Sequence, residues 1–271
     1  MEPAPPLQTY WLLSRTHTYS LLLAVPLLLI YEALLLLVNR LRPDERGVAN
    51  MAELVLRRLL ATIGAGGAAT LVLSLVAVAL LLIARERHLH PELPLWPLRG
   101  WVFGAMLLES AAWSFVLGRG VGRLTARLTG DAGGGRPSVL ALGAQSLSRG
   151  EGFVLSLGAG LFEELLFRVI LVSGASAALL ALQRSGTVRD FLAAIGLDGP
   201  VRGTAFVAFL SALSFSLMHY VGGYGDPFTL SSFVFRFLAG LVFTGVYLLR
   251  GFGIVAWSHA LYDVGIYLLR P

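Results

Sequence analysis

Residues 152–182 read GFVLSLGAGLFEELLFRVILVSGASAALLAL, an apolar stretch that contains Glu163, Glu164 and Arg168. About 20 apolar residues are enough for a helix to cross the hydrocarbon core of a bilayer, so this stretch exceeds one perpendicular crossing. A charge at the centre of such a helix costs at least about 2.5–3.5 kcal/mol. The stretch therefore predicts a membrane helix, and its three charges are candidates for function.

The composition of the whole chain is that of a membrane protein. Of its 271 residues, 56% are hydrophobic and 14% are charged, and the mean hydropathy is +0.75. Soluble domains have roughly 45–50% apolar and about 25% charged residues. These values exclude disordered and ordinary soluble classes. The absence of cysteine excludes disulfides, cysteine catalysis and cysteine-ligated zinc.

The 21 basic residues are all arginine, and the net charge is +5. Most of them lie in short segments between apolar runs, where arginine orients helices and contacts anionic headgroups. We therefore expect the lipid bilayer as a partner and no nucleic acid. The composition, rich in Arg, Ala, Leu and Gly, suggests a GC-rich bacterial genome. The inner (cytoplasmic) membrane of a bacterium is the expected location.

Seven apolar stretches predict an all-α fold, a polytopic membrane bundle of about seven transmembrane helices, or eight if the long fourth one is broken. They lie at residues 19–38, 59–84, 100–118, 152–182, 203–220, 228–249 and 252–269. The connecting segments are too short to bury a core of their own. We divide the chain into residues 1–135, with three spans and no recognised motif, and residues 136–271, with four spans and the charged motifs.

The two adjacent glutamates of the fourth span predict two different roles. Glu164 and Arg168 are four residues apart and can pair on one face of a helix. Glu163 projects about 100° away from Glu164. We expect Glu164 and Arg168 to form a structural pair and Glu163 to face a cavity. A buried ion cluster without chemistry is the alternative interpretation.

Two later spans contribute imidazoles. His219 lies near the end of the fifth span, where a solvated ring at the interface is the simplest interpretation of that residue alone. His259 and Asp263 are four residues apart in the seventh span and face the same side. Together with Glu163 these groups could activate water, with Glu163 as general base. They could also hold a divalent metal such as Zn²⁺ through Glu163, His219 and His259.

The three motifs resemble those of the CPBP intramembrane proteases, in the pattern Glu163-Glu164-x-x-x-Arg168, Phe215-x-x-x-His219 and His259-x-x-x-Asp263. This family is also called CAAX prenyl protease 2 or Abi, and it includes lysostaphin resistance protein A-like proteins. The resemblance covers roughly residues 140–271. Any one of the motifs is weak evidence, whereas three in order, each on its own span, are specific.

The resemblance implies a membrane-embedded protease, a metalloendopeptidase or a glutamate-dependent hydrolase, that cleaves a membrane-associated protein or peptide. It implies that Glu163 activates the water and that His219 helps to bind it. It also implies that Glu164 and Arg168 support the site. With a bacterial source we do not expect prenylated substrates. By analogy with the family, bacteriocin maturation, immunity or removal of carboxy-terminal sorting signals is more natural.

The last motif departs from the family at one position. His259 and residue 263 would stabilise the oxyanion or complete a metal site, and the family often has Asn where this chain has Asp263. An ionised aspartate accepts hydrogen bonds but cannot donate one to an oxyanion. Asp263 could instead orient His259, act in its protonated form, or favour a metal.

Two other classes of function compete with the protease. Histidines and acids within a membrane also form the proton relays of coupled transporters, although the two halves of this chain show no repeat. A non-catalytic membrane scaffold is the third possibility. Three further charges lie within spans, and we expect Arg236 to pair with Glu32 or Glu109. Capture of a substrate carboxylate by Arg236 is the alternative.

Overall fold

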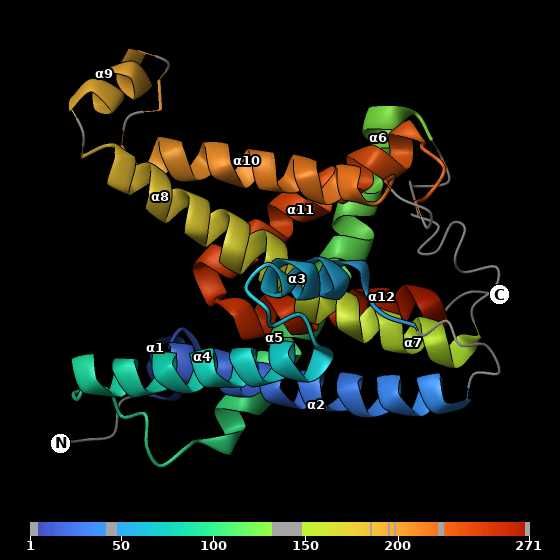
Figure 1. Ribbon diagram of the computed structural model, residues 1–271, viewed down its shortest axis with the longest axis horizontal. Helices are drawn as coiled ribbons and strands as arrows, with labels where there is room; N and C mark the ends of the chain where they lie inside the picture. The colour runs from blue at the N-terminus through green and yellow to red at the C-terminus, as the bar shows by residue number, and fades with distance from the viewer. Residues whose placement is uncertain are drawn as a thin grey trace. The chain divides into compact units, whose positions relative to one another are not determined.

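The computed structural model describes residues 5–41, 48–131, 148–184, 186–194, 196–197, 199–221 and 225–268. All regular structure in these ranges is helical, which confirms the all-α prediction (Figure 1). The chain forms two compact units. Unit 1 consists of Met1–Ser114, Arg149–Glu163 and Val246–Pro271, and unit 2 consists of Phe115–Ser148 and Glu164–Gly245. Both units take segments from either side of residue 135, and the division into residues 1–135 and 136–271 stays a prediction.

Unit 1 is built around α12, which packs against α2, α7 and the short π-helical segment η2. Helix α3 also packs against η2, and α2 packs against α4 (Figure 1). Its elements are α1 (Pro6–Ser14), α2 (His17–Leu41), α3 (Met51–Ala61), α4 (Ala68–Leu89), α5 (Gly100–Val116), α7 (Arg149–Gly158), η2 (Ala159–Glu163) and α12 (Phe252–Leu268). The last two residues of α5 belong to unit 2, because the first segment of unit 1 ends at Ser114.

Unit 2 is organised around α10, which packs against α8 and the π-helical segment η3 (Figure 1). Helix α11 approaches α10 closely at Gly240, where an added Cβ would lie 3.0 Å from the Cα of Ala212. The elements of this unit are η1 (Leu117–Val121), α6 (Gly122–Thr129), η3 (Leu165–Gly174), α8 (Ala175–Leu182), α9 (Gly186–Ala194), α10 (Pro200–Met218) and most of α11 (Leu230–Arg250).

The protein is a multi-pass integral membrane protein. Within the described ranges, six helices are long and apolar enough to cross a bilayer: His17–Leu41, Ala68–Leu89, Gly100–Thr129, Gly150–Leu182, Pro200–Met218 and Leu230–Arg250. The seventh predicted span is helix α12, whose 17 residues are near the lower limit for a crossing. The fourth predicted span is one continuous helical segment of 33 residues, so it is not broken into two.

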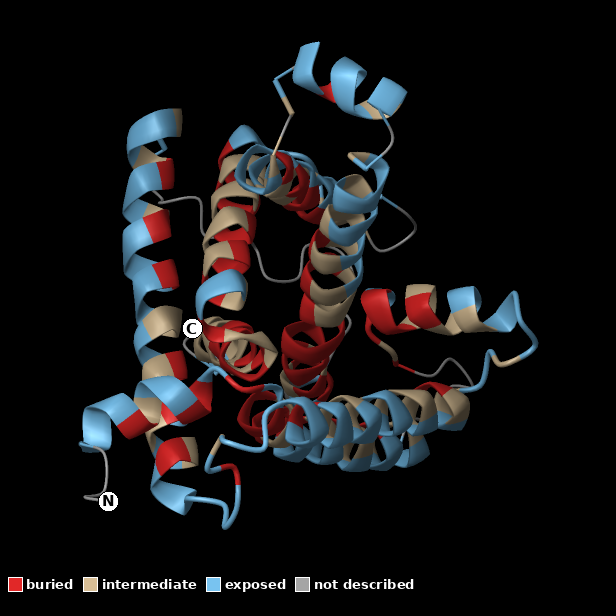
Figure 2. Ribbon diagram, turned by 90° about the vertical axis from the view of Figure 1, so that its left-hand side faces the viewer, coloured by how far each residue is buried: buried red, intermediate tan, exposed pale blue. Residues whose placement is uncertain are grey.

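Helix α4 shows most directly why the chain needs lipid. Only 6% of its most apolar window is buried within the protein. Leu73, Leu80 and Leu81 are between 61% and 69% exposed. Buried residues form stripes along one side of several helices, and intermediate or exposed residues cover the other sides (Figure 2). An apolar surface of this kind is unfavourable in water and is satisfied by acyl chains.

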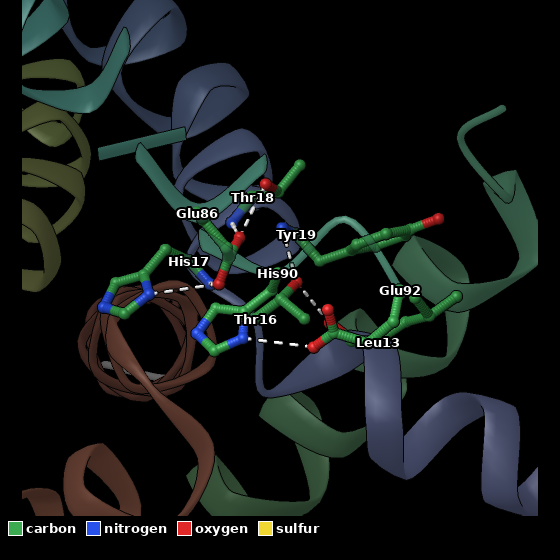
Figure 3. A network of polar contacts seen from close by, with 8 residues as sticks. All are labelled: Leu13, Thr16, His17, Thr18, Tyr19, Glu86, His90 and Glu92. Atoms are coloured by element: carbon green, nitrogen blue, oxygen red, sulfur yellow. Dashed lines mark hydrogen bonds and ion pairs between the residues drawn. The ribbon is translucent and has the colours of Figure 1, made fainter. Parts of the chain in front are cut away.

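The amino-terminal end of α2 is held by a carboxylate of α4. Glu86 accepts hydrogen bonds from the backbone nitrogens of His17 and Thr18, at 2.7 and 2.8 Å (Figure 3). It also accepts one from the Thr18 hydroxyl at 2.7 Å. The first N–H groups of a helix have no partner within the helix, so Glu86 satisfies donors that hydrocarbon could not. This contact ties one end of α2 to the carboxy-terminal end of α4.

The predicted pairing of Arg236 with Glu32 or Glu109 is wrong. In unit 2, Arg236 pairs with Asp226 in the loop that precedes its own helix. In unit 1, Glu109 pairs with Arg250, whose Nε and Nη2 donate to its two oxygens at 2.7 and 2.8 Å. The sequence pattern could not identify these partners because Asp226 and Arg250 lie at or beyond the ends of the apolar stretches.

Candidate catalytic site

Unit 1 places Glu163 and His259 on two helices that touch. Glu163 is half-buried at the end of η2, and His259 is 4% exposed on α12. The helices meet at Gly160, where an added Cβ would lie 2.5 Å from the oxygen of Ala256 and 2.6 Å from the nitrogen of Ala260. Glycine thus permits an approach that any side chain would obstruct. It sets η2, three residues before Glu163, against the turn of α12 that carries His259.

His259 and Asp263 face the same side of α12, as their spacing predicts. His259 Nε2 lies 3.4 Å from Asp263 Oδ2. This is longer than an ordinary hydrogen bond but within ion-pair distance when the imidazole is protonated. The carboxylate can therefore orient the ring and stabilise its charged form.

Asn50 contacts Glu163, and we did not identify it from the sequence. Its Nδ2 donates to Glu163 Oε1 at 3.3 Å, and its own Oδ1 accepts from the backbone nitrogen of Ala52 at 2.8 Å. The second contact is the N-cap of α3. Asn is a preferred N-cap residue. An Asn directly before a helix is a sequence signal for an N-cap. It does not indicate that the same side chain also contacts Glu163, which lies far away in the sequence.

A buried polar network holds α3 against α2 and η2. Glu53 of α3 is 1% exposed, accepts a hydrogen bond from the hydroxyl of Tyr31 and pairs with Arg57. The ring of Tyr31 in turn contacts Phe162 edge-to-face, with ring centroids 5.3 Å apart. These contacts fix the start of α3, and with it Asn50, beside η2.

In unit 2, the other two charged residues of the first motif form a fully buried ion pair. Arg168 Nη1 lies 3.1 Å from Glu164 Oε1, and both side chains are fully buried. Arg168 Nη2 donates to the oxygen of Gly240 at 3.2 Å. Three aromatic rings surround the guanidinium, with centroids 4.6 to 5.9 Å from its carbon: Phe167, Phe215 and Phe243. A charge pair enclosed by rings and a backbone carbonyl is suited to joining η3 to α10 and α11.

The second motif continues this cluster to His219. The ring of Phe215 contacts the imidazole edge-to-face, with centroids 5.0 Å apart. His219 Nδ1 donates to the oxygen of Phe215 at 2.7 Å, which places a proton on Nδ1; in the neutral ring Nε2 then carries the lone pair. His219 is half-buried, and its own oxygen accepts from the nitrogen of Asp226 at 2.8 Å. The ring is therefore held by specific contacts, unlike a solvated imidazole.

The structure thus describes the six predicted site residues as two sets. Glu163, His259 and Asp263 belong to unit 1, and the others, Glu164, Arg168 and His219, belong to unit 2. Among the residues that the structure describes, no three His, Asp or Glu side chains are grouped as ligands of a metal ion. A metal held by Glu163, His219 and His259 therefore stays a prediction.

Comparison with known proteins adds one finding. Residues 146–265 match the family model described as type II CAAX prenyl endopeptidase Rce1-like. The matched range contains all three motifs and confirms the resemblance to the CAAX prenyl protease family. No curated protein and no solved structure matches the chain.

Proposed function

We propose, from the match of residues 146–265 to the family model of type II CAAX prenyl endopeptidases (Rce1-like), that this protein is an intramembrane endopeptidase. It would hydrolyse a peptide bond of a membrane-associated protein or peptide. The observation that carries the proposal is the contact at Gly160, which holds η2 with Glu163 against the turn of α12 with His259. An acid and an imidazole on touching membrane helices are expensive to bury and suited to activating water.

In the proposed reaction, Glu163 takes a proton from water while the water oxygen attacks the carbonyl carbon of the substrate. The tetrahedral intermediate then collapses, the C–N bond breaks, and the proton held by Glu163 passes to the leaving amine. His219 would orient the water in its neutral form, in which Nδ1 donates to Phe215 and Nε2 can accept a hydrogen bond.

His259 would stabilise the oxyanion, and Asp263 would orient it. A protonated imidazole can donate to the negative oxygen of the intermediate, whereas an ionised carboxylate cannot. The ion-pair distance of 3.4 Å between His259 and Asp263 supports this assignment. Glu164 and Arg168 would not touch the substrate. Their buried ion pair would hold η3, the segment that follows Glu163 in the chain, in place.

The substrate would reach the site from the bilayer. The matched family is named for prenylated CAAX proteins, which is the first substrate class to test. For a protein of a bacterial inner membrane we propose instead an unprenylated membrane protein or peptide. A farnesylated peptide and the same peptide without the farnesyl group, both internally quenched and presented in proteoliposomes, distinguish the two classes.

The deciding experiment is comparative membrane proteomics of wild type against Glu163→Ala. We expect unprocessed termini of specific membrane proteins to accumulate in the variant, while the variant itself inserts and unfolds at the wild-type temperature. Wild-type processing by Glu163→Ala contradicts the proposal.

Dialysis against a chelator, followed by Zn²⁺ addition, tests a metal-dependent form of the reaction. Activity that is lost and then restored supports a metal, and unchanged activity supports water activation by Glu163 alone.

A further inference from the structure

We infer that Asn50 is a positioning residue for Glu163, contributed by a part of the chain outside the family match at residues 146–265. The inference rests on the proposed function, because it assigns Glu163 the role of base. Asn50 is 7% exposed, and its amide Nδ2 donates to Glu163 Oε1 at 3.3 Å. Both residues belong to unit 1, and α3 packs directly against η2.

The amide of Asn50 can point in only one direction. Its Oδ1 accepts from the nitrogen of Ala52 at 2.8 Å, and this donor at the start of α3 needs an acceptor. With Oδ1 used in this way, the remaining polar atom is Nδ2, which faces the carboxylate. A flipped amide would place a carbonyl oxygen against Glu163 and lose both bonds. The cap therefore sets the direction of the donor.

The backbone that carries Asn50 is also held. Glu53, one turn along α3, is 1% exposed and joins Tyr31 of α2 and Arg57. Asn50 is thus anchored by the cap on one side and by the Glu53 network on the other. A fixed donor at one carboxylate oxygen restricts rotation of the whole group and so orients its second oxygen.

The donor is neutral, which suits a base. A guanidinium in this place would form an ion pair and reduce the tendency of the carboxylate to take a proton. The amide of Asn50 orients the carboxylate and adds no charge of its own. Amino-terminal helices that carry no motif of the family would then contribute to the chemistry, in addition to anchoring the protein.

Three variants separate positioning from capping. Asp and Ser are good N-cap residues, so Asn50→Asp and Asn50→Ser keep the acceptor for Ala52 and remove the amide donor. Asn50→Ala removes both. If Asn50 positions Glu163, Asn50→Ser unfolds at the wild-type temperature but cleaves roughly 10–100-fold more slowly, the effect of losing one hydrogen bond to a charged group. The loss should fall on kcat and leave KM unchanged, because Asn50 is 7% exposed and is proposed to act through Glu163. Asn50→Asp also places a second carboxylate against Glu163, so we expect it to lower both the unfolding temperature and the cleavage rate.

The readout is cleavage of the quenched peptide, or of the Glu163-dependent termini found by proteomics, per molecule of folded protein. Asn39→Asp is the matched control: Asn39 Nδ2 donates to the oxygen of Val48 at 3.2 Å in the same unit, and we expect cleavage to stay at the wild-type level. Wild-type kcat in Asn50→Ser would overturn the inference and show Asn50 to be a cap only. Full activity of Glu163→Ala is a separate result and refutes the proposed function itself.

Discussion

Glu163 and Glu164 are consecutive residues of one helical segment, yet the groups around them differ in kind. Glu163 is half-buried and receives a hydrogen bond from the neutral amide of Asn50. Glu164 is fully buried and faces the guanidinium of Arg168. Glu164 thus faces a buried cation, whereas the Asn50 amide that contacts Glu163 carries no charge. Under the proposed function, these two identical side chains would have two roles, Glu164 as a structural partner and Glu163 as the base.

The same comparison extends to the supporting residues. Around Glu164 the support comes from aromatic rings and a backbone carbonyl, which exclude water from the pair. Around Glu163 we find contacts of another kind: the Asn50 amide, which is fixed by its helix cap, and the close approach of η2 to α12 at Gly160. Substitutions in the first region should therefore reduce stability, and those in the second should reduce activity.

The largest effect on stability is expected for Arg168→Met. Removal of one partner leaves Glu164 as an uncompensated buried charge, which costs about 3–5 kcal/mol. Denaturation with SDS from mixed micelles measures this loss, and exposed Arg189→Met serves as the control that should change little. The double variant Glu164→Leu/Arg168→Met should recover most of the loss, because no charge then stays buried. A loss below about 1 kcal/mol for Arg168→Met would contradict a structural role.

An intermediate effect is expected for Gly160→Ala. The added methyl group would meet Ala256 and Ala260 at 2.5–2.6 Å, so η2 and α12 must move apart. Overpacking of this kind costs about 1–3 kcal/mol, and the displacement should also lower cleavage activity. Gly174→Ala is the matched control in the same span, since no atom lies within 4 Å of its added Cβ. If both variants behave as wild type, the contact at Gly160 does not position Glu163.

The smallest effect on stability is expected for Glu163→Gln. The amide oxygen of glutamine can still accept from Asn50, and the site is half-buried, so the free energy of unfolding should change by less than about 1 kcal/mol. Cleavage should nevertheless be abolished, because an amide cannot act as a base. A loss of stability equal to that of Arg168→Met would abolish the distinction between the two glutamates.

Local spacing was enough to predict several features correctly. Glu164 and Arg168 are one helical turn apart, so their pairing follows from helix geometry alone, and the same holds for His259 and Asp263. Contacts between residues of different segments could not be predicted from spacing. Asn50 lies 113 positions from Glu163, and Arg236 pairs with Asp226 in a loop, contrary to our prediction.

The sequence by itself determined the membrane class, the helical architecture and the three charged motifs, because hydropathy and helical periodicity are local properties of the chain. Only the tertiary structure decided which carboxylate is sealed and which is oriented by an amide. That choice depends on how closely helices approach, at Gly160 for η2 and α12, and on which cap lies beside which acid. Such contacts join residues far apart in the chain, and no local pattern encodes them.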